Sequence, residues 1–284
     1  MHQVKFVEEG HRYYNELDQD YISVTTLIGR YKIKFDTQYW STYKAVKDTL
    51  ESINMFKSFK IEAGGWQNVV AYWGDNPVHL DAVLDRKNYY IEKWRQEGIT
   101  AAEKGTAEHL RREEALLAKS HITSKKNVHM PVRRSPIMEF DGESNGVFAE
   151  AVIWNDKYQV AGQVDLIEKE GIYLDIKDFK TNKKIDREGF MNAKMHHPLS
   201  DVTDSSYYHY QLQMSIYGWM AEQIGYKVRS LELIHVTEGG DISYDVEYMP
   251  GWVEKIMNHY DRRDIIETEE CSSADYNYTS ISTK

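Results

Sequence analysis

The first 120 residues carry a mostly helical pattern of hydrophobic and polar positions. Residues 4–14, VKFVEEGHRYY, alternate around a Glu-Glu-Gly turn and predict a small hairpin. Ser23 is a suitable helix N-cap, and the pattern after it predicts a helical region that continues through residue 56. Asp75-Asn76-Pro77 predicts the start of a helix that reaches about Arg95, and a further helix is expected from about Thr100 to Lys119.

After this helix the period of the pattern changes. Residues 119–135, KSHITSKKNVHMPVRRS, are polar and basic and contain a proline, which favours a loop. Residues 148–181 then alternate polar and apolar positions, with turn residues at Asn155-Asp156 and Glu170-Gly171. This alternation predicts a meander of about three strands.

The rest of the chain predicts helices and strands of one domain. The expected elements are a helix at 208–225 ended by Gly225, strands at 231–237 and 242–249, and a helix from about Gly251 to Glu267. No internal repeat or linker interrupts the pattern, so a single domain of residues 1–284 is expected. We expect its hairpin and helical lobe at 1–98, its core at about 99–267, and a flexible tail at 268–284.

Composition and charge narrow the class of protein. With 41% hydrophobic and 28% charged residues, the chain is long enough to bury a core. Its single cysteine, Cys271, excludes a disulfide framework and any four-cysteine metal site within one chain. The start MHQVKFVEEGHRYY has no signal-peptide or transit-peptide character, and no run of about 18 apolar residues occurs, so a cytoplasmic protein without a membrane partner is expected.

The formal net charge of -10 argues against a polyanionic partner. Catalytic carboxylates and an acidic tail, however, conceal a local basic track from a whole-chain total. The positions of the basic residues therefore say more about a nucleic-acid partner than the net charge does.

Residues 174–184, LDIKDFKTNKK, contain the pattern Asp-x-Lys in two overlapping frames. On a strand, Asp178 and Lys180 continue the apolar row of Leu174 and Ile176, whereas Asp175 and Lys177 point to the other face. The apolar row faces the core, so the second frame ends where strand-end residues enter a cleft.

A hairpin that turns at Glu170-Gly171 brings Asp165 of the preceding strand near Asp178. Two carboxylates and the Lys180 ammonium in one cleft suit a metal-dependent phosphodiesterase, because carboxylate oxygens hold Mg²⁺ or Mn²⁺. The lysine would orient or deprotonate water, or neutralise charge on the phosphate. The alternative is that both aspartates cap turns and Lys180 is an ordinary surface lysine.

Two helical stripes supply further candidates. Gly105, His109 and Glu113 recur at i, i+4 and i+8, which makes His109 a candidate metal ligand supported by Glu113. A surface His/Glu pair is the alternative. Gln213 and Tyr217 share a face of a later helix, where they would orient a catalytic lysine, contact DNA, or simply pack.

Together, GTAEH with Glu113, AGQVD, DFKT and the Gln213-x-x-x-Tyr217 pair resemble, in order and approximate spacing, the RecB-type PD-(D/E)XK nucleases. The resemblance is to stand-alone members, such as phage exonucleases and the mitochondrial genome maintenance exonuclease. It spans roughly residues 10–235 and includes HRYYNELDQDYISVTTLIGRY near the start. It implies an α/β (α+β) fold with a restriction-endonuclease-like core, in which a mixed sheet is flanked by helices, and an N-terminal helical lobe.

The resemblance also implies roles for individual residues. The implied metal ligands are His109, Asp165, Asp178 and the backbone carbonyl of Phe179, with Glu150 as a further candidate. Lys180 is the implied catalytic lysine, and Thr181 completes an Asp-x-Lys-Thr form that selects the second frame. One or two Mg²⁺ or Mn²⁺ ions are the expected cofactors. Cluster-binding cysteines and a helicase phosphate loop are absent from the sequence, so neither an iron–sulfur cluster nor a nucleotide is expected.

A DNA partner would account for basic residues that cluster in the sequence before and after the predicted catalytic strands. These residues are Lys125, Lys126, Arg133 and Arg134 before the strands, and Lys183, Lys184 and Arg187 after them. They are predicted to line a phosphate track, with tyrosines and tryptophans stacking on bases. The alternative is that they are solvated surface charges.

The leading hypothesis is a metal-dependent DNA exonuclease that acts on single strands or free ends in phage-type replication, recombination or repair. The helical lobe is expected to cover the cleft, so that a strand enters by threading. The rival hypotheses are a structure-specific or nicking endonuclease with the same site, and an inactive DNA-binding or assembly protein.

Overall fold

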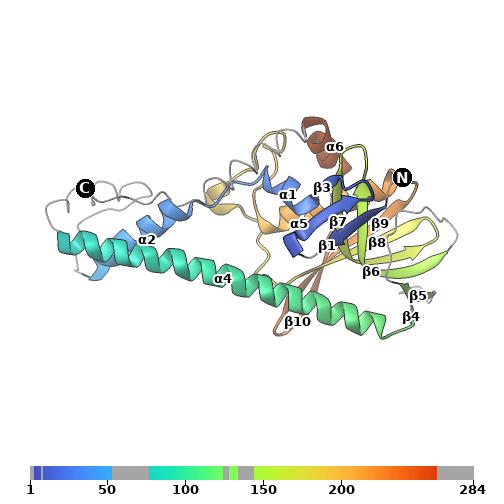
Figure 1. Cartoon of the computed structure of the whole chain (residues 1–284), viewed down its shortest axis with the longest axis horizontal. Coiled ribbons are helices and arrows are strands. Elements are labelled where there is room, and N and C mark those ends of the chain that lie inside the picture. Colours follow the sequence, from blue (N-terminus) through green and yellow to red (C-terminus); the bar gives the residue numbers. More distant parts are fainter. Residues whose placement is uncertain (1–2, 8, 53–76, 124–127, 134–143, 261–284) are drawn as a thin grey trace. The chain divides into compact units, whose positions relative to one another are not determined.

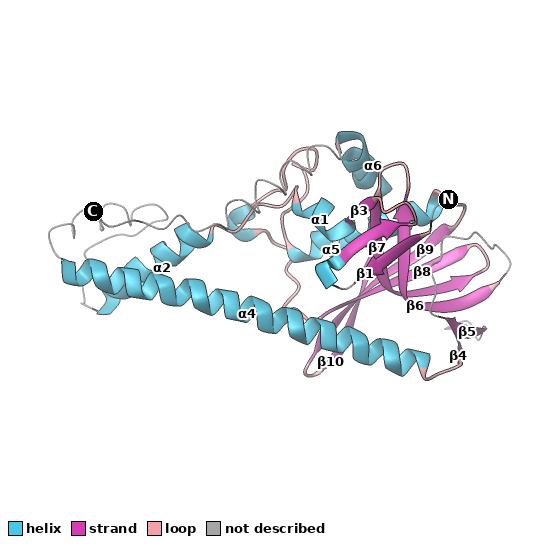
Figure 2. Cartoon of the chain, in the orientation of Figure 1, coloured by secondary structure: helices cyan, strands magenta, loops and turns pink. Residues whose placement is uncertain are grey.

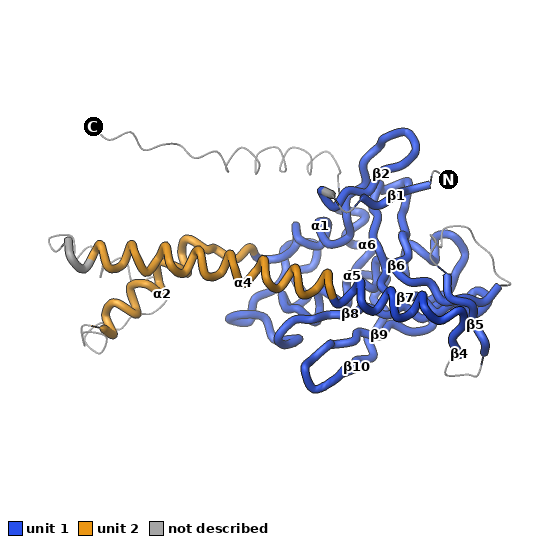
Figure 3. The backbone as a smooth tube through the Cα atoms, turned by 60° about the horizontal axis from the view of Figure 1, so that its bottom comes forward, with its two compact units in different colours: residues 1–33, 108–284 blue, residues 34–107 orange. Residues whose placement is uncertain are grey.

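The computed structural model describes residues 3–7, 9–52, 77–123, 128–133 and 144–260. The chain divides into two compact units, unit 1 formed by residues 1–33 and 108–284 and unit 2 by residues 34–107 (Figure 3). The N-terminal hairpin groups with unit 1, whereas the sequence analysis placed it in one lobe with the helices. The expected tail at 268–284 lies outside the described residues.

Unit 1 is built around a mixed β-sheet, drawn in magenta in Figure 2. Its strands are β1 Val4–Val7, β2 Arg12–Asn15, β3 Asp20–Ser23, β4 His121–Thr123, β5 His129–Arg133, β6 Asn145–Asn155, β7 Val160–Glu170, β8 Tyr173–Lys180, β9 Lys227–Thr237 and β10 Gly240–Val246. The order is β1-β2-β3-β7-β6-β5-β4, while β8 pairs with β7 and β9, and β10 with β9. The predicted meander is confirmed as antiparallel β6, β7 and β8, and β9 runs parallel to β8.

Helices flank this sheet, which confirms the predicted α+β class (Figure 1). In unit 1 they are α1 Val24–Gly29, α5 Ser206–Glu222 and α6 Pro250–His259, with the short 3-10 helices η1 Glu9–His11 and η3 Phe190–Asn192. Helix α5 contacts β6, β8 and β9, and both α1 and α6 pack on α5. Residues 211–221 of α5 are all buried, as expected for a helix enclosed by a sheet and other helices. The Ser23 N-cap is confirmed, because its hydroxyl accepts a hydrogen bond from Thr26 N at 3.0 Å.

Helix α4, Pro77–Leu117, is one continuous helix of 41 residues where the sequence predicted two. Gly98 lies inside it. Gly105 lies inside it as well. Each interior glycine costs about 1 kcal/mol relative to alanine, and cooperative propagation of a long helix offsets such costs. The predicted start signal at Asp75-Asn76 lies outside the described residues.

Unit 2 combines α2, Thr37–Ser52, with the first part of α4. Arg86 Nη1 donates to Thr49 Oγ1 at 2.6 Å, and the Tyr90 hydroxyl donates to Asp48. Helices α1 and α2 are separated by residues 30–36, so the helical region predicted after Ser23 is not continuous. The expectation that this unit covers a cleft stays a prediction.

The basic segment at 119–135 was predicted as a loop, but it contains β4 and β5, which pair antiparallel. The polar β4 lies at the edge of the sheet, where polar residues are tolerated, and Pro131 of β5 comes just before the residues that pair with β6, Val132 and Arg133. Lys125, Lys126 and Arg134 lie outside the described residues.

Among the helices that the structure describes, none has both the length and the apolar character needed to cross a membrane.

Candidate active site

The candidate site lies where β7 and β8 separate. Their pairing runs from Glu170↔Tyr173 to Leu166↔Lys177 and stops there. Continued by one step, this register places Asp165 opposite Asp178 on one face, as the sequence predicted. At this point Asp165 Oδ2 accepts a hydrogen bond from Phe179 N at 2.6 Å. The Asp165 side chain thus takes the place of a backbone hydrogen bond between β7 and β8. This hydrogen bond fixes its carboxylate beside the end of β8.

Glu150 lies opposite Asp165 on the other side of β7. The β6–β7 register pairs Ala149 with Leu166 and Ala151 with Val164, so Glu150 and Asp165 are direct neighbours across the strands. Glu150 has a left-handed backbone, with φ of 49°. Like charges on directly opposed residues and a positive φ at a non-glycine residue are both unfavourable. Their coincidence at one position points to a functional constraint.

His109, from the part of α4 in unit 1, lies against this carboxylate pair. Its Nδ1 is 3.3 Å from Asp165 Oδ1 and 3.6 Å from Glu150 Oε1. One ligand atom from each of the three residues lies within 4.8 Å of the others. Hydrogen bonds to Asp165 and Glu150 raise the pKa of His109 to about 10, whereas burial raises the pKa of Glu150.

This donor set fits a divalent metal ion. Two carboxylates and one imidazole converge on one point, and in the metal-free arrangement a proton on His109 is the positive charge between them. Oxygen ligands suit Mg²⁺ and Mn²⁺, and an added imidazole suits the softer of the two. The structure therefore brings together three of the residues named from the sequence: His109, Glu150 and Asp165.

Asp178 and Lys180 form a buried ion pair next to this cluster. Lys180 Nζ lies 2.7 Å from Asp178 Oδ2, and Asp178 is 1% exposed. Burial raises the pKa of Asp178. For Lys180, burial opposes the charge, but Asp178 and Asp165 more than compensate and raise the pKa to about 12. Lys180 is thus a charged ammonium at neutral pH that pairs with Asp178, and a ligand role for Asp178 stays a prediction.

Gln213 and Tyr217 of α5 lie behind Asp178. Gln213 Nε2 donates to Tyr217 Oη at 2.9 Å and to Asp178 Oδ1 at 3.4 Å. A Cβ atom on Gly162 would lie 2.5 Å from the Tyr217 ring, so the glycine of AGQVD makes room for this tyrosine. Both predicted residues are therefore in contact, directly or through each other, with the Asp178 carboxylate.

A pocket of about 250 Å³ opens on the cluster of His109, Glu150 and Asp165. It is lined by His109, Glu150 and Asp165, by the predicted Glu113, and by Phe179. Through its charge, Glu113 contributes to the raised pKa of Glu150. Phe179 contributes its amide to Asp165 and its side chain to the pocket wall, whereas a ligand role for its carbonyl stays a prediction.

Three basic residues of this pocket were not among the candidates named from the sequence: Arg111, Arg112 and Lys119. Arg112 donates to both carboxylate oxygens of Asp241, at 2.8 Å and 2.7 Å, and its guanidinium lies 4.6 Å from the centre of the Phe179 ring. The helical spacing i, i+3 from His109 was the signal that would have identified Arg112.

The other predicted residues are more exposed. Thr181 is half-buried directly after β8, and Arg133, Lys183, Lys184 and Arg187 are exposed. Lys184 Nζ pairs with Asp186 at 2.9 Å, and the Arg187 guanidinium lies 3.9 Å from the centre of the Tyr207 ring. Their role in binding DNA stays a prediction.

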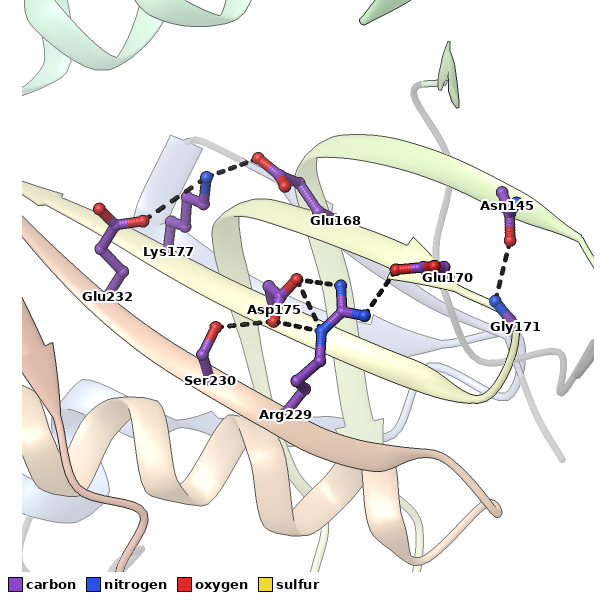
Figure 4. Close-up of polar contacts among 9 residues, drawn as sticks. All are labelled: Asn145, Glu168, Glu170, Gly171, Asp175, Lys177, Arg229, Ser230 and Glu232. Atoms are coloured by element: carbon purple, nitrogen blue, oxygen red, sulfur yellow. Dashed lines mark hydrogen bonds and ion pairs between the residues drawn. The ribbon is translucent and has the colours of Figure 1, made fainter. Parts of the chain in front are cut away.

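The other Asp-x-Lys frame belongs to a charge ladder on the opposite face of β8 (Figure 4). Lys177 Nζ lies 2.5 Å from Glu168 Oε1 and 3.5 Å from Glu232 Oε2. Asp175 accepts hydrogen bonds from Arg229 and Ser230. Both residues of this frame are thus bound to neighbouring strands.

Two comparisons with known proteins find similarity. The sequence profile described as the PD-(D/E)XK nuclease superfamily matches residues 73–264, more than half of the chain. Among solved structures, one titled "Crystal structure of SSO0001" is similar at 16% sequence identity. The match covers 68% of this chain and 71% of that chain, with a TM-score of 0.30. No curated protein sequence matches the chain.

Proposed function

Since the chain belongs to the PD-(D/E)XK nuclease superfamily, and is therefore a metal-dependent nuclease, we propose that it is a Mg²⁺- or Mn²⁺-dependent DNA exonuclease of the RecB type. Its proposed substrates are single-stranded DNA and free DNA ends. The observation that carries the proposal is the convergence of His109, Glu150 and Asp165 beside the buried Asp178–Lys180 pair. This is a metal-binding cluster with a cation placed for a phosphate.

The residues divide into metal-holding, charge-stabilising and orienting groups. A bound divalent ion would polarise the phosphate and acidify a water molecule. We assign the holding of the ion to His109, Glu150 and Asp165, with Asp178 and the Phe179 carbonyl as further ligands. Lys180 holds its ammonium 2.7 Å from Asp178, where it stabilises negative charge that develops on a phosphate oxygen.

Gln213, Tyr217 and Thr181 have supporting roles in this proposal. Gln213 donates to Asp178 and is itself fixed by Tyr217, so the pair orients a proposed ligand. Arg133, Lys183, Lys184 and Arg187 bind backbone phosphates of the DNA, and the pocket residues Arg111 and Lys119 extend this set.

Exonuclease action is supported by the order of motifs along the chain. GTAEH, AGQVD, DFKT and the Gln213/Tyr217 pair follow one another as in the stand-alone phage exonucleases, which also suggests a role in phage-type replication, recombination or repair. An exonuclease needs a free end, whereas an endonuclease with the same site does not.

The test is incubation of end-labelled linear and closed circular single-stranded DNA of one sequence with Mn²⁺, Mg²⁺ or EDTA. We expect the linear strand to be degraded with either metal ion, the circle to survive, and EDTA to stop the reaction. The Lys180→Ala protein, prepared identically, serves as the control for contaminating nucleases. Degradation of the circle at the same rate as the linear strand would favour the endonuclease.

A further inference from the structure

The loop between β8 and α5 ends in a turn that exposes two large apolar side chains. Phe190 is 67% exposed and Met191 is 72% exposed, the highest values for large hydrophobic side chains among the residues that the structure describes. They belong to the 3-10 turn η3. Exposure of two adjacent large apolar residues is typical of a contact surface.

This turn is fixed in an unfavourable backbone conformation. Met191 and Asn192 have φ of 52° and 59°, a left-handed region that side chains such as methionine rarely adopt. Asn192 N donates to Gly189 O, and Ala193 N donates to Phe190 O, each at 3.0 Å. A Cβ atom on Gly189 would lie 2.5 Å from Ala193 O, so only glycine fits there. Two consecutive strained residues present Phe190 and Met191 outward.

The turn is anchored next to the catalytic strand end. Asp204 N donates to Ala193 O at 3.0 Å, and the Asp204 carboxylate pairs with His209 at 2.5 Å. The residue after His209 on α5 is Tyr210, whose ring centre lies 5.0 Å from Lys180 Nζ. One segment of α5 thus contacts both the anchor of the turn and the proposed catalytic lysine.

We propose that Phe190 and Met191 form a base-binding tip, which contacts an unpaired base of the substrate strand beside the site. The same loop carries the exposed Lys183, whose ammonium complements a backbone phosphate, whereas Lys184 pairs with Asp186. An exposed apolar tip with a lysine earlier in the same loop matches single-stranded nucleic acid, which offers a flat base next to each phosphate. The inference rests on the proposed action on DNA and assigns a subsite to that action.

The first test measures the affinity for a short single-stranded DNA in full-length protein that also carries Lys180→Ala, so that the DNA stays uncut. Phe190→Ala should raise the Kd by about 5- to 150-fold, the effect of losing one base–aromatic stack. The matched control is Leu17→Ala, since Leu17 is 62% exposed in the turn between β2 and β3. It should leave the Kd unchanged.

The second test separates base contacts from phosphate contacts. Replacing one nucleotide at a time by an abasic one should identify a position that weakens binding to the Phe190 form but not to Phe190→Ala, because the contact is already lost. Phe190→Ala should keep the salt dependence of binding, whereas Lys183→Ala should lower the slope of log Kd against log salt by about 0.7. Additive losses at every abasic position would overturn the proposal.

The third test excludes a purely structural effect of the turn. Met191→Gly removes the side chain at a positive φ that glycine adopts freely, so binding should weaken without a loss in Tm. Asn192→Gly relaxes the backbone in the same way but keeps both apolar side chains, so binding should be retained. Equal binding by Met191→Gly and Asn192→Gly would overturn the role of Met191 in the tip.

The two proposals fail in different ways. If the wild-type protein cleaves no DNA in a Lys180-dependent manner with either metal ion, the proposed function fails. If it cleaves DNA, but Phe190→Ala and Met191→Gly bind DNA as Leu17→Ala does, only the base-binding tip fails.

Discussion

The two faces of β8 carry the same short pattern and use it in different ways. Asp175 and Lys177 are both bound to charged partners on β7 and β9, in a ladder that joins three strands. Asp178 and Lys180 are bound to each other, next to a carboxylate cluster. A charged pair that is satisfied by its neighbours is structural, whereas one held beside unfavourable charges is available for chemistry.

The largest expected difference between the two faces is in catalysis. Lys180→Ala should lower the rate of DNA cleavage by about 100-fold or more, because it removes the cation beside the proposed phosphate position. Lys177→Ala should keep most of the activity, since Lys177 points to the ladder. Cleavage assays on linear single-stranded DNA with both folded variants measure this difference. Comparable losses would show that the assignment of the two faces is wrong.

The second difference is in metal affinity. Asp165→Asn and Asp178→Asn should each weaken Mn²⁺ binding roughly tenfold or more, because each removes a charged oxygen ligand. Asp175→Asn, three residues before Asp178, is the matched variant and should bind Mn²⁺ as the wild type does. Titration calorimetry gives the three affinities. An unchanged affinity in Asp165→Asn and Asp178→Asn would remove both residues from the metal site.

A smaller effect concerns the choice of metal ion. His109→Ala should lower the ratio of Mn²⁺-supported to Mg²⁺-supported activity by a few-fold, because imidazole favours the softer ion. The ratio is measured in matched cleavage assays at saturating metal concentrations. The same ratio in wild type and variant would contradict a ligand role for His109.

The smallest expected effect is on the stability of the fold. It tests whether the face of β8 that carries Asp175 has a structural role. Burial disfavours the Asp175 carboxylate, but hydrogen bonds from Arg229 and Ser230 outweigh it and hold its pKa below the ordinary value. Asp175→Asn should therefore lower the free energy of unfolding by about 1–2 kcal/mol at pH 7, with DNA cleavage retained.

The sign of the pH dependence follows from the depressed pKa of Asp175. A carboxyl group of this kind stabilises the fold above its unfolded pKa of about 3.9, and the contribution is lost as the pH falls through its folded pKa. The gap between wild type and Asp175→Asn in urea unfolding should thus narrow below about pH 4. A gap that widens in acid would mean that Arg229 and Ser230 do not stabilise the charged form.

The elements nearest the candidate site were the ones that sequence could predict. Strict alternation along residues 148–181 gave the meander, and its turn at Glu170-Gly171 gave the register that sets Asp165 opposite Asp178. Local periodicity carries this information because strand faces alternate with a fixed period. The α5 helix with Gln213 and Tyr217 followed from the same kind of local pattern.

The missed features depend on contacts between distant segments. β4 and β5 are only three and five residues long, too short for a clear alternation, and they form strands by pairing with each other and with β6. Arg112 reaches the pocket because Asp241, from the β9–β10 hairpin, binds its guanidinium. The left-handed backbone of Glu150 has no signature in the residues around it. Such features arise only when the chain is folded.

The pairing of β3 with β7 has a consequence for how the protein is made. It joins residues 22 and 23 to residues 160 and 161, and the Tyr21 hydroxyl reaches Asp156, 135 residues away, at 2.8 Å. A ribosome adds about 5–20 residues per second, so the first hairpin waits on the order of ten seconds for its partner strand. During that interval the edge of β3 is open to pairing with other nascent chains. The N-terminal hairpin is therefore exposed to mispairing until β7 has been synthesised.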